Sequence, residues 1–437
     1  MGFFDKLFKK KEESKEAPAA KPKAEPTSTS ASFKAEPAPA KTGAPKAAAP
    51  KSEGANPGPY DFIVPPVVTA QDGDVPKDAV LPAADLGPLL PGAPSGGKIK
   101  LAVYWTAACG GCDVSLLDTH ERLLTIGDMA EIVMWPIAAD GKEKDIAAME
   151  DGEITVSLIN GAIRNSENEH MAKLLRQKSK IVVAYGTCAM FGGSPALANL
   201  VPGGAKEILD YVYTKTPSSA NFQADYHKDA PVIPQTSYQA PEGELTIPTL
   251  YDTVKTLDQV VDVDYYIPGC PPLPESISQL LKAVADFVYN GVPLPPKGTE
   301  VGITTKTLCE ECPRKKENAR ITEIKEPHEV DIKEGVCLMD QGILCLGPAT
   351  MGGCGARCTR VGQPCRGCYG PSPDVQEQGA SMFTAVASLF PILDEDPTCG
   401  EDEIIKIMST IKDPLGYFYA YTLGKSLIKR AVKEGGQ

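Results

Sequence analysis

The residues best suited to chemistry are four cysteines in three short, glycine-containing stretches of the sequence. They are Cys109 and Cys112 in TAACGGCD (106–113), Cys188 in GTCAMFGGSP (186–195) and Cys270 in IPGCPPLPES (267–276). Each stretch follows an apolar, β-branched run. Open α/β sheets bind ligands at the carboxyl ends of parallel strands, so three such loops can converge on one point. Neighbouring glycines and prolines let the backbone approach a bulky object, and four thiolates around it predict a 4Fe–4S cluster.

A structural zinc site is the alternative for these four cysteines, because zinc also accepts four thiolates. Zinc sites usually combine two compact knuckles within a few dozen residues. Here two of the four cysteines, Cys188 and Cys270, stand alone and far apart in the sequence. The spacing therefore favours iron–sulfur over zinc.

A second field of cysteines follows in residues 297–399. Its members are Cys309, Cys312, Cys337, Cys345, Cys354, Cys358, Cys365 and Cys368, with Cys399 after them. The segment is rich in glycine and proline and poor in periodic apolar pattern. We therefore expect it to have little core of its own and to be organised by bound clusters. Two zinc ribbons would explain the CxxC pairs at 309/312 and 365/368, but not the four cysteines between them.

The thirteen cysteines can thus provide twelve ligands for three clusters, with one left over. We expect the remaining residue, Cys399, to be a buried, unliganded thiol. Several clusters in one chain indicate an electron relay, which needs a donor at one end and an acceptor at the other.

Strands alternate with helices in residues 98–296, which predicts an α/β fold with a flavodoxin-like parallel sheet. We expect strands at 98–105, 131–137, 154–161, 180–186 and 261–267, helices at 114–128, 166–179 and 274–291, and an inserted surface loop at 214–247. Ser166 is the expected N-cap of its helix. Asp113 is expected to cap the helix that follows it. His120 and His170 are expected to be surface or packed residues rather than ligands.

The expected domains are residues 1–97, 98–296 and 297–437. The first opens with MGFFDKLFKKK (1–11), a basic amphipathic tip that could lie on an anionic membrane or dock in a partner's groove; a frayed, solvated terminus is the alternative. Residues 12–58 are mostly Ala, Pro, Lys, Glu, Ser and Thr, which predicts a disordered tether. The last domain is expected to be a loop-rich iron–sulfur domain.

Composition limits the function classes further. The 437-residue chain has a formal charge of −13, which argues against nucleic acid as its main partner. No apolar run reaches the length of a membrane span, and no secretory signal is recognisable. We therefore expect a cytoplasmic protein that the tip could attach peripherally to the membrane. Thirteen cysteines in the cytosol favour metal over disulfides.

The motifs CGGC, GTCAMFGG and PGCPP, followed by GVCLMDQGILCLGPATMGGC and PCRGC, resemble the small subunit of a nickel–iron hydrogenase. The resemblance covers roughly residues 98–390 and is closest to the cytosolic, methyl-viologen-reducing type that partners heterodisulfide reductase. It implies that Cys109, Cys112, Cys188 and Cys270 hold a proximal 4Fe–4S cluster. It implies that Cys309, Cys312, Cys337 and Cys345 hold the distal cluster, and that Cys354, Cys358, Cys365 and Cys368 hold the medial one.

The sequence departs from the periplasmic members of that family at three positions. Cys309 stands where they have a histidine as distal ligand. Their medial cluster is 3Fe–4S and lacks one cysteine, whereas Cys358 is available here as a fourth medial ligand. Ala108 replaces a glutamate next to the first CxxC pair, so the proton-path role of that glutamate does not carry over. An all-cysteine relay carries more negative charge and implies lower potentials.

The resemblance also implies the partners. The nickel–iron centre would lie on a large subunit, because this chain lacks that subunit's nickel-binding cysteine pairs. The electron acceptor would be a 2Fe–2S adaptor protein, heterodisulfide reductase or ferredoxin. Three rival interpretations remain: a complex I-like quinone oxidoreductase iron–sulfur subunit, a polyferredoxin-like carrier without a hydrogenase partner, and a zinc-stapled scaffold.

Overall fold

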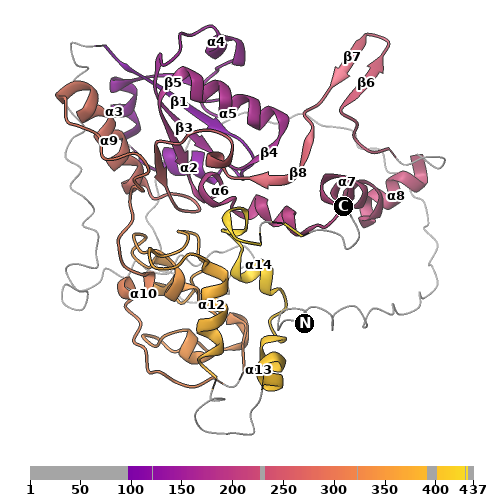
Figure 1. Ribbon diagram of the computed structural model, residues 1–437, viewed down its shortest axis with the longest axis vertical. Coiled ribbons are helices and arrows are strands. Elements are labelled where there is room, and N and C mark those ends of the chain that lie inside the picture. The colour runs from indigo at the N-terminus through magenta and orange to yellow at the C-terminus, as the bar shows by residue number, and fades with distance from the viewer. Residues whose placement is uncertain are drawn as a thin grey trace, which may run out of the picture. The chain divides into compact units, whose positions relative to one another are not determined.

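Five parallel strands form the central sheet, in the order β2-β1-β3-β5-β9 (Figure 1). They are β1 (Ile99–Trp105), β2 (Ala130–Met134), β3 (Ile154–Asn160), β5 (Ser179–Tyr185) and β9 (Tyr265–Ile267). If the five strands of this sheet are numbered 1 to 5 in the order of the chain, their order across the sheet is 2-1-3-4-5, which is the flavodoxin-like order. The register pairs Leu101 with Val156 and Val183 with Tyr265. The predicted α/β fold is therefore confirmed.

The computed structural model describes residues 97–431, except for residues 121, 227–231, 322, 391–400 and 429. These residues belong to a single compact unit of the chain. The predicted N-terminal extension, apart from Gly97, and Cys399 lie outside the described residues.

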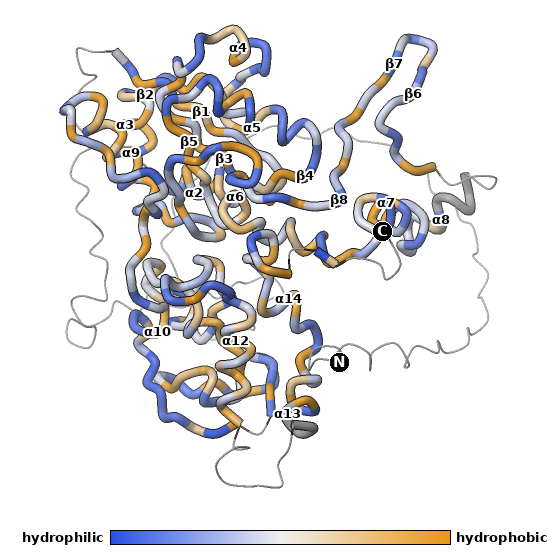
Figure 2. The backbone as a smooth tube through the Cα atoms, in the orientation of Figure 1, coloured by the Kyte–Doolittle hydropathy of each residue, from blue (hydrophilic) through white to orange (hydrophobic). Residues whose placement is uncertain are grey.

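Along β1 and β5, alternate residues enter separate cores on the two faces of the sheet, as the pleat requires. On β1, Leu101 and Val103 join one core, whereas Ala102 and Tyr104 join the other. Helices α2 (Gly111–Leu117), α3 (Arg122–Met129) and α9 (Pro274–Asn290) pack on the first face. Helices α4 (Glu143–Ala147), α5 (Ser166–Lys178) and α6 (Thr187–Phe191) pack on the second. The sheet is correspondingly apolar in Figure 2.

Local signals set the ends of these helices. Helix α9 starts at Pro274 and ends before Gly291, whose φ is 65°, as the sequence predicts. Two expectations were wrong. The single helix expected at 114–128 is broken into α2 and α3 around His120, whose φ is 55°. The N-cap of α5 is Asn165 rather than Ser166, and its side chain accepts a hydrogen bond from the N–H of Asn168 at 2.8 Å.

The segment expected to be a loop contains regular structure. It includes helix α8 (Pro217–Tyr226) and the hairpin of β6 (Ser237–Ala240) and β7 (Gly243–Thr246), which extends away from the sheet in Figure 1. The elements around it are η1 (Ser194–Leu200), α7 (Gly204–Asp210), the π-helix η2 (Tyr211–Lys215), β8 (Leu250–Lys255), which pairs with β4 (Ile163–Asn165), and η3 (Leu257–Gln259). Because most hairpin residues are exposed on both faces, they lack the alternation that predicts a strand.

The C-terminal segment is loop-rich, as predicted, and its helices are short. They are α10 (Leu308–Glu311), η4 (Pro327–Glu329), η5 (Met339–Gln341), η6 (Gly347–Ala349), α11 (Arg357–Arg360), α12 (Gln378–Ala387), α13 (Glu401–Met408), α14 (Pro414–Phe418) and η7 (Leu423–Lys425). Contrary to expectation, it has a sizeable core, in which Leu346, Met382, Val386 and Phe418 are buried. No helix in the described part of the chain is long and apolar enough to cross a membrane.

Candidate metal centres

The first four cysteines lie where strands β1, β5 and β9 end. Cys109 and Cys112 follow β1, just before and just after the start of α2. Cys188 follows β5 inside α6, and Cys270 follows β9. Because the strands are parallel members of one sheet, their carboxyl ends share an edge. The structure thus brings these four residues together, and we call them the first group.

Two glycines leave room for the sulfur atoms of the first group. Gly186 has a φ of 89°, and a Cβ atom added there would stand 2.5 Å from Cys112 Sγ. Gly193 has a φ of 54°, and a Cβ atom there would stand 2.5 Å from Cys188 Sγ. No side chain fits at such distances, and positive φ disfavours side chains in any case. Both positions therefore require glycine.

The thiols of the first group affect one another's ionisation. Burial raises the pKa of Cys112 above its ordinary value of 9.0, and the thiols of Cys188 and Cys270 raise it further. Burial also raises the pKa of Cys188 to about 12, with contributions from Cys270 and Cys109. The four sulfurs are therefore within electrostatic reach of each other. In the metal-free chain these two buried thiols are protonated at neutral pH, so a metal must displace protons to bind.

Asp113 is buried next to this group and does not cap α2, contrary to expectation. Its carboxylate accepts hydrogen bonds from Trp135 Nε1 at 2.9 Å and from Asn160 Nδ2 at 3.0 Å. The N-cap position is Gly110, which has no side chain to offer. Asp113 therefore joins α2 to the ends of β2 and β3, the two strands that flank β1.

A second group of cysteines lines one small cavity in the C-terminal segment. Its members are Cys309, Cys312, Cys337 and Cys345. Burial raises the pKa of Cys309 to about 12; the charge of Lys316 opposes the rise, and Cys345 is the largest of the thiol contributions to it. Gly347 also lines this cavity. A Cβ atom there would stand 3.0 Å from Cys309 Sγ, so position 347 favours glycine.

A third group is formed by Cys354, Cys358, Cys365 and Cys368, around the short helix α11. Burial raises the pKa of Cys368 to about 12, and the thiols of Cys354 and Cys358 contribute to the rise. Burial also raises the pKa of Cys365 well above its ordinary value, with added effects of Cys345 and Cys368. The third group is thus within electrostatic reach of the second.

Direct contacts connect the third group to both others. The backbone N–H of Cys365 donates to Cys345 Sγ of the second group at 3.2 Å. A hydrogen bond from the backbone N–H of Cys270 lowers the pKa of the Cys368 thiol and so opposes the rise that burial causes. The buried hydroxyl of Thr187 accepts from the N–H of Gly269 at 3.1 Å and donates to the carbonyl of Cys368. The order of contact is therefore first group, third group, second group.

The donor set of each group fits an iron–sulfur cluster. All twelve thiols are free of disulfides, and thiolates are the ligands of such clusters. Backbone N–H groups already point at several sulfurs, for example Gly367 at Cys365 Sγ, at 3.4 Å. No three His, Cys, Asp or Glu side chains of the described residues are close enough to share a single metal ion. A cluster does not require that closeness, because its thiolates bind different irons.

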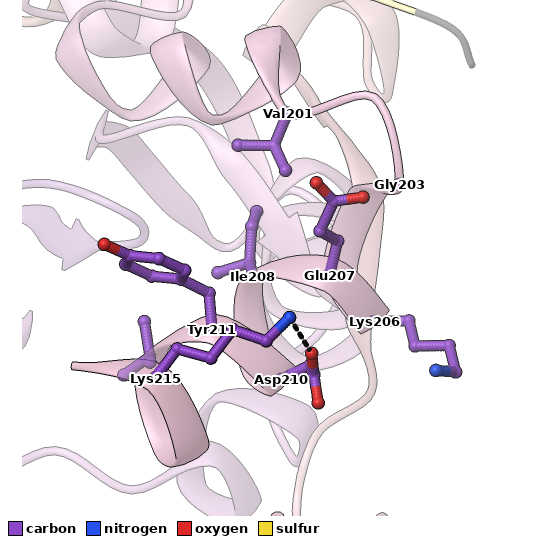
Figure 3. Close-up of a pocket in the computed structure, with 9 residues that line it drawn as sticks. Val201, Gly203, Lys206, Glu207, Ile208, Asp210, Tyr211 and Lys215 are labelled. Atoms are coloured by element: carbon purple, nitrogen blue, oxygen red, sulfur yellow. Dashed lines mark ion pairs between the residues drawn. The ribbon is translucent and has the colours of Figure 1, made fainter. Parts of the chain in front are cut away.

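A larger cavity lies away from the cysteines, along α7 and the π-helix η2 (Figure 3). It encloses about 630 Å³ and is lined by Val201, Gly203, Lys206, Glu207, Ile208, Asp210, Tyr211, Val212 and Lys215. The ion pair drawn in Figure 3 joins Lys215 Nζ to Asp210 Oδ2 at 2.7 Å. The lining offers no thiol or histidine, so this cavity does not contribute to the cysteine groups.

Several residues around the cysteines carried no recognisable signal in the sequence. The hydroxyl of Tyr185 donates to the carbonyl of Cys112 at 2.9 Å. The buried carboxylate of Glu311 accepts from the N–H groups of Gly353 and Gly355, at 2.6 and 3.1 Å. These contacts join residues distant in the sequence, so no local pattern predicts them.

One family match covers the sheet and the first group. The family described as "NADH ubiquinone oxidoreductase, 20 Kd subunit" matches residues 109–284. The match begins at Cys109 and ends before the second and third groups. The match thus covers the flavodoxin-like sheet and the cysteine site at its edge.

Curated relatives match more of the chain. An F420-non-reducing hydrogenase iron–sulfur subunit from Archaeoglobus profundus is 39% identical over 76% of this chain and 99% of its own length. An F420-non-reducing hydrogenase subunit from Methanothermobacter marburgensis is 36% identical over 78% of this chain and 99% of its own. A chain of a solved NAD+-reducing [NiFe]-hydrogenase is 30% identical, with a TM-score of 0.35, over 43% of this chain and 92% of that chain.

The chain belongs to the family of these F420-non-reducing hydrogenase iron–sulfur subunits, among the small subunits of nickel–iron hydrogenases. It is therefore a hydrogenase subunit, and the resemblance seen in its motifs is confirmed. The match to residues 109–284 is to a family whose description names the complex I-like alternative, and it covers less of the chain than these relatives do. The relatives that span three quarters of the chain are hydrogenase subunits.

Proposed function

We propose that this chain relays electrons between the nickel–iron site of a large subunit and an external acceptor, through three 4Fe–4S clusters. The observation that supports this most strongly is the arrangement of twelve thiols as three groups of four in a fixed order of contact. A linear order of electron carriers is what a relay needs. Each cluster, when bound, would accept and release one electron at a time.

The groups take the roles that the family resemblance implies. Cys109, Cys112, Cys188 and Cys270 would hold the proximal cluster. Cys354, Cys358, Cys365 and Cys368 would hold the medial cluster, and Cys309, Cys312, Cys337 and Cys345 the distal one. The contacts of the third group with both others support its medial place. Its four cysteines support a 4Fe–4S rather than a 3Fe–4S cluster at that place.

The chain's own residues would hold the groups at fixed separations. Thr187 ties the loop of Cys270 to the loop of Cys368 through its buried hydroxyl. The N–H of Cys365 donates to Cys345 Sγ; such hydrogen bonds stabilise the thiolate and raise the potential of a cluster. Burial of Cys112, Cys188 and Cys365 keeps water away from the sulfurs.

The surface beside the first group supports a large-subunit partner. Cys109 and Cys270 are exposed. Around the CGGC loop, Trp105, Val114 and Leu117 are 40%, 55% and 41% exposed. Exposed apolar side chains gathered next to a functional site are typical of a protein–protein interface. We therefore assign this surface to the large subunit, whose active site would then lie next to the proximal cluster.

The experiment is anaerobic purification of the native complex, with metal analysis and H2-dependent reduction followed by visible absorbance. Co-purification with a nickel-bearing chain, and bleaching of the iron–sulfur absorbance by H2, are the expected results. Iron without nickel would favour the polyferredoxin-like carrier. Zinc without acid-labile sulfide would favour the scaffold and overturn the relay.

The acceptor and the tether complete the proposal. We assign the acceptor to a 2Fe–2S adaptor protein or heterodisulfide reductase, in line with the type of hydrogenase that the sequence resembles.

The basic amphipathic residues 1–11 would tether the complex to a membrane or a larger assembly. Deletion of residues 1–58 should leave the iron content unchanged and release the protein from the particulate fraction. Unchanged fractionation would refute the tether.

A further inference from the structure

Two adjacent glutamates in the second cysteine group lie in opposite environments. They are Glu310 and Glu311, between Cys309 and Cys312 in the motif CEEC. Glu310 is exposed, and its carboxylate accepts from the N–H of Thr307 at 2.7 Å, so it caps its own helix. Glu311 is only 7% exposed. A glutamate is rarely buried to this extent unless the surrounding groups compensate its charge.

The loop that carries Cys354 of the third group compensates this buried carboxylate. Glu311 Oε1 accepts from the N–H of Gly353 at 2.6 Å and from the hydroxyl of Thr304 at 3.0 Å. Glu311 Oε2 accepts from the N–H of Gly355 at 3.1 Å. The two glycines are the immediate neighbours of Cys354 in the sequence. Glu311 therefore joins the CxxC pair of the second group to a ligand loop of the third.

The backbone of this loop adopts a conformation that needs such support. Gly353, Gly355 and Ala356 all have positive φ, of 123°, 65° and 54°, and a positive φ is unfavourable for alanine. A Cβ atom added to Gly352 would stand 2.5 Å from Glu311 Oε1, so the carboxylate packs tightly against the loop. Backbone of this kind persists only when neighbouring contacts determine it. The hydrogen bonds of Glu311 are contacts of that sort.

The loop, in this conformation, divides its N–H groups between the carboxylate and the sulfur. Burial raises the pKa of Cys354; hydrogen bonds from the backbone N–H groups of Ala356 and Arg357 oppose the rise, and the charge of Glu311 adds to it. The N–H groups of the two flanking glycines point at the carboxylate instead. Glu311 thus acts on Cys354 both through the shape of the loop and through its charge.

The charge of Glu311 is not cancelled by a direct ion pair. No lysine or arginine in the described part of the chain forms a salt bridge with it. Its three partners are neutral donors, and charges inside a protein are screened less than charges in water. Reduction adds negative charge to a cluster, so a buried carboxylate beside it makes reduction less favourable.

We propose that Glu311 is a positioning residue, which fixes the Cys354 loop to the second cysteine group and whose buried charge lowers the reduction potential of the adjoining clusters. The inference rests on the proposed relay, because a potential exists only where clusters are bound. Glu310 would have neither effect. Its contacts stay within its own helix, and solvent and salt screen an exposed charge.

The test is an EPR-monitored redox titration of the anaerobically purified complex. Glu311→Gln removes the charge and keeps the length of the side chain. Glu311→Asp keeps the charge but shortens the reach to the glycine N–H groups. Glu310→Gln is the matched control, since it makes the same charge change one residue away at an exposed position. Iron release to a chelator and hydrogen exchange in the peptide around Cys354 are measured on the same samples.

In E311Q, reduction of at least one cluster should become about ten-fold more favourable, which is an upward shift of about 59 mV for one electron. E310Q should keep the potentials of the unmodified complex. E311D should keep most of the low potential, whereas its Cys354 peptide should exchange faster and its iron should be released about ten-fold faster, because the glycine N–H groups lose their acceptor. A purely structural role would make the potential follow the loosening of the loop rather than the charge.

Unchanged potentials in E311Q, an equal shift in E310Q, or a shift in E311D as large as that in E311Q would overturn the inference. If E311Q bound no clusters, E311D would decide, and normal exchange and iron retention in E311D would overturn the positioning role. An unmodified complex without iron–sulfur signals would overturn the relay itself. That failure is recognised before any variant is compared.

Discussion

Replacement of Gly186 by alanine should selectively empty the proximal site. Gly186 has a φ of 89° and a ψ of 164°, a combination that costs a side-chain-bearing residue about 1–3 kcal/mol. The added Cβ atom would also stand 2.5 Å from Cys112 Sγ, and forcing such a contact apart costs about 1–3 kcal/mol more. The sum is about 2–6 kcal/mol, concentrated on a ligand sulfur. We expect G186A to lose about four of about twelve irons.

The matched control is Gly298→Ala. Gly298 also has a φ of 89°, but a Cβ atom there would meet nothing within 4 Å. The control therefore carries backbone strain without the contact to a sulfur. Iron per chain and urea unfolding of the complex should be measured for both variants. If G186A retained as much iron as G298A, the account of the first group would be refuted.

Three further predictions concern single residues and pH. Asp113→Ala should lower the free energy of unfolding by about 2–4 kcal/mol, because it leaves the buried donors of Trp135 and Asn160 unpaired; thermal unfolding checks this, with Asp113→Asn as the milder control. Cys358→Ala should cost about one iron per chain and yield the EPR signal of an oxidised 3Fe–4S cluster, whereas an unchanged iron content would exclude Cys358 as a ligand. Reconstitution of the metal-free chain should speed up as pH rises, because burial raises the pKa of Cys188 and Cys309 to about 12 and protons must leave for iron to bind; a rate independent of pH would contradict this.

The sheet was predictable because its strands are buried on both faces. Short apolar, β-branched runs such as 98–105 and 180–186 are typical of strands in a parallel sheet that is covered on both faces. The strand ends then placed Cys109, Cys188 and Cys270 at one edge by topology alone. Cys399 lies outside the described residues, so its expected role stays a prediction.

The sequence could not reveal the contacts that join distant segments. Thr187 and Cys368 are 181 residues apart, and Asp113 meets Asn160 across the sheet. Such pairs depend on tertiary packing, which no local periodicity encodes. The same reason explains the unexpected core of the C-terminal segment. Its buried residues, such as Leu346 and Met382, are contributed singly by loops and short helices rather than by one amphipathic face.

The helix boundaries that differ from expectation have local causes. His120 adopts a left-handed conformation between α2 and α3, which a histidine adopts only in a minority of cases. Asn165 and Ser166 are both good N-caps. The structure uses the first because its side chain reaches the N–H of Asn168.

The most direct test of the central claim is a count of acid-labile sulfide in the purified heterodimer of this chain and its large subunit. Three 4Fe–4S clusters on the twelve cysteines predict about twelve sulfides per heterodimer. A count near four would leave the second and third groups without clusters. That result would contradict the relay, even though the fold and the family would stand.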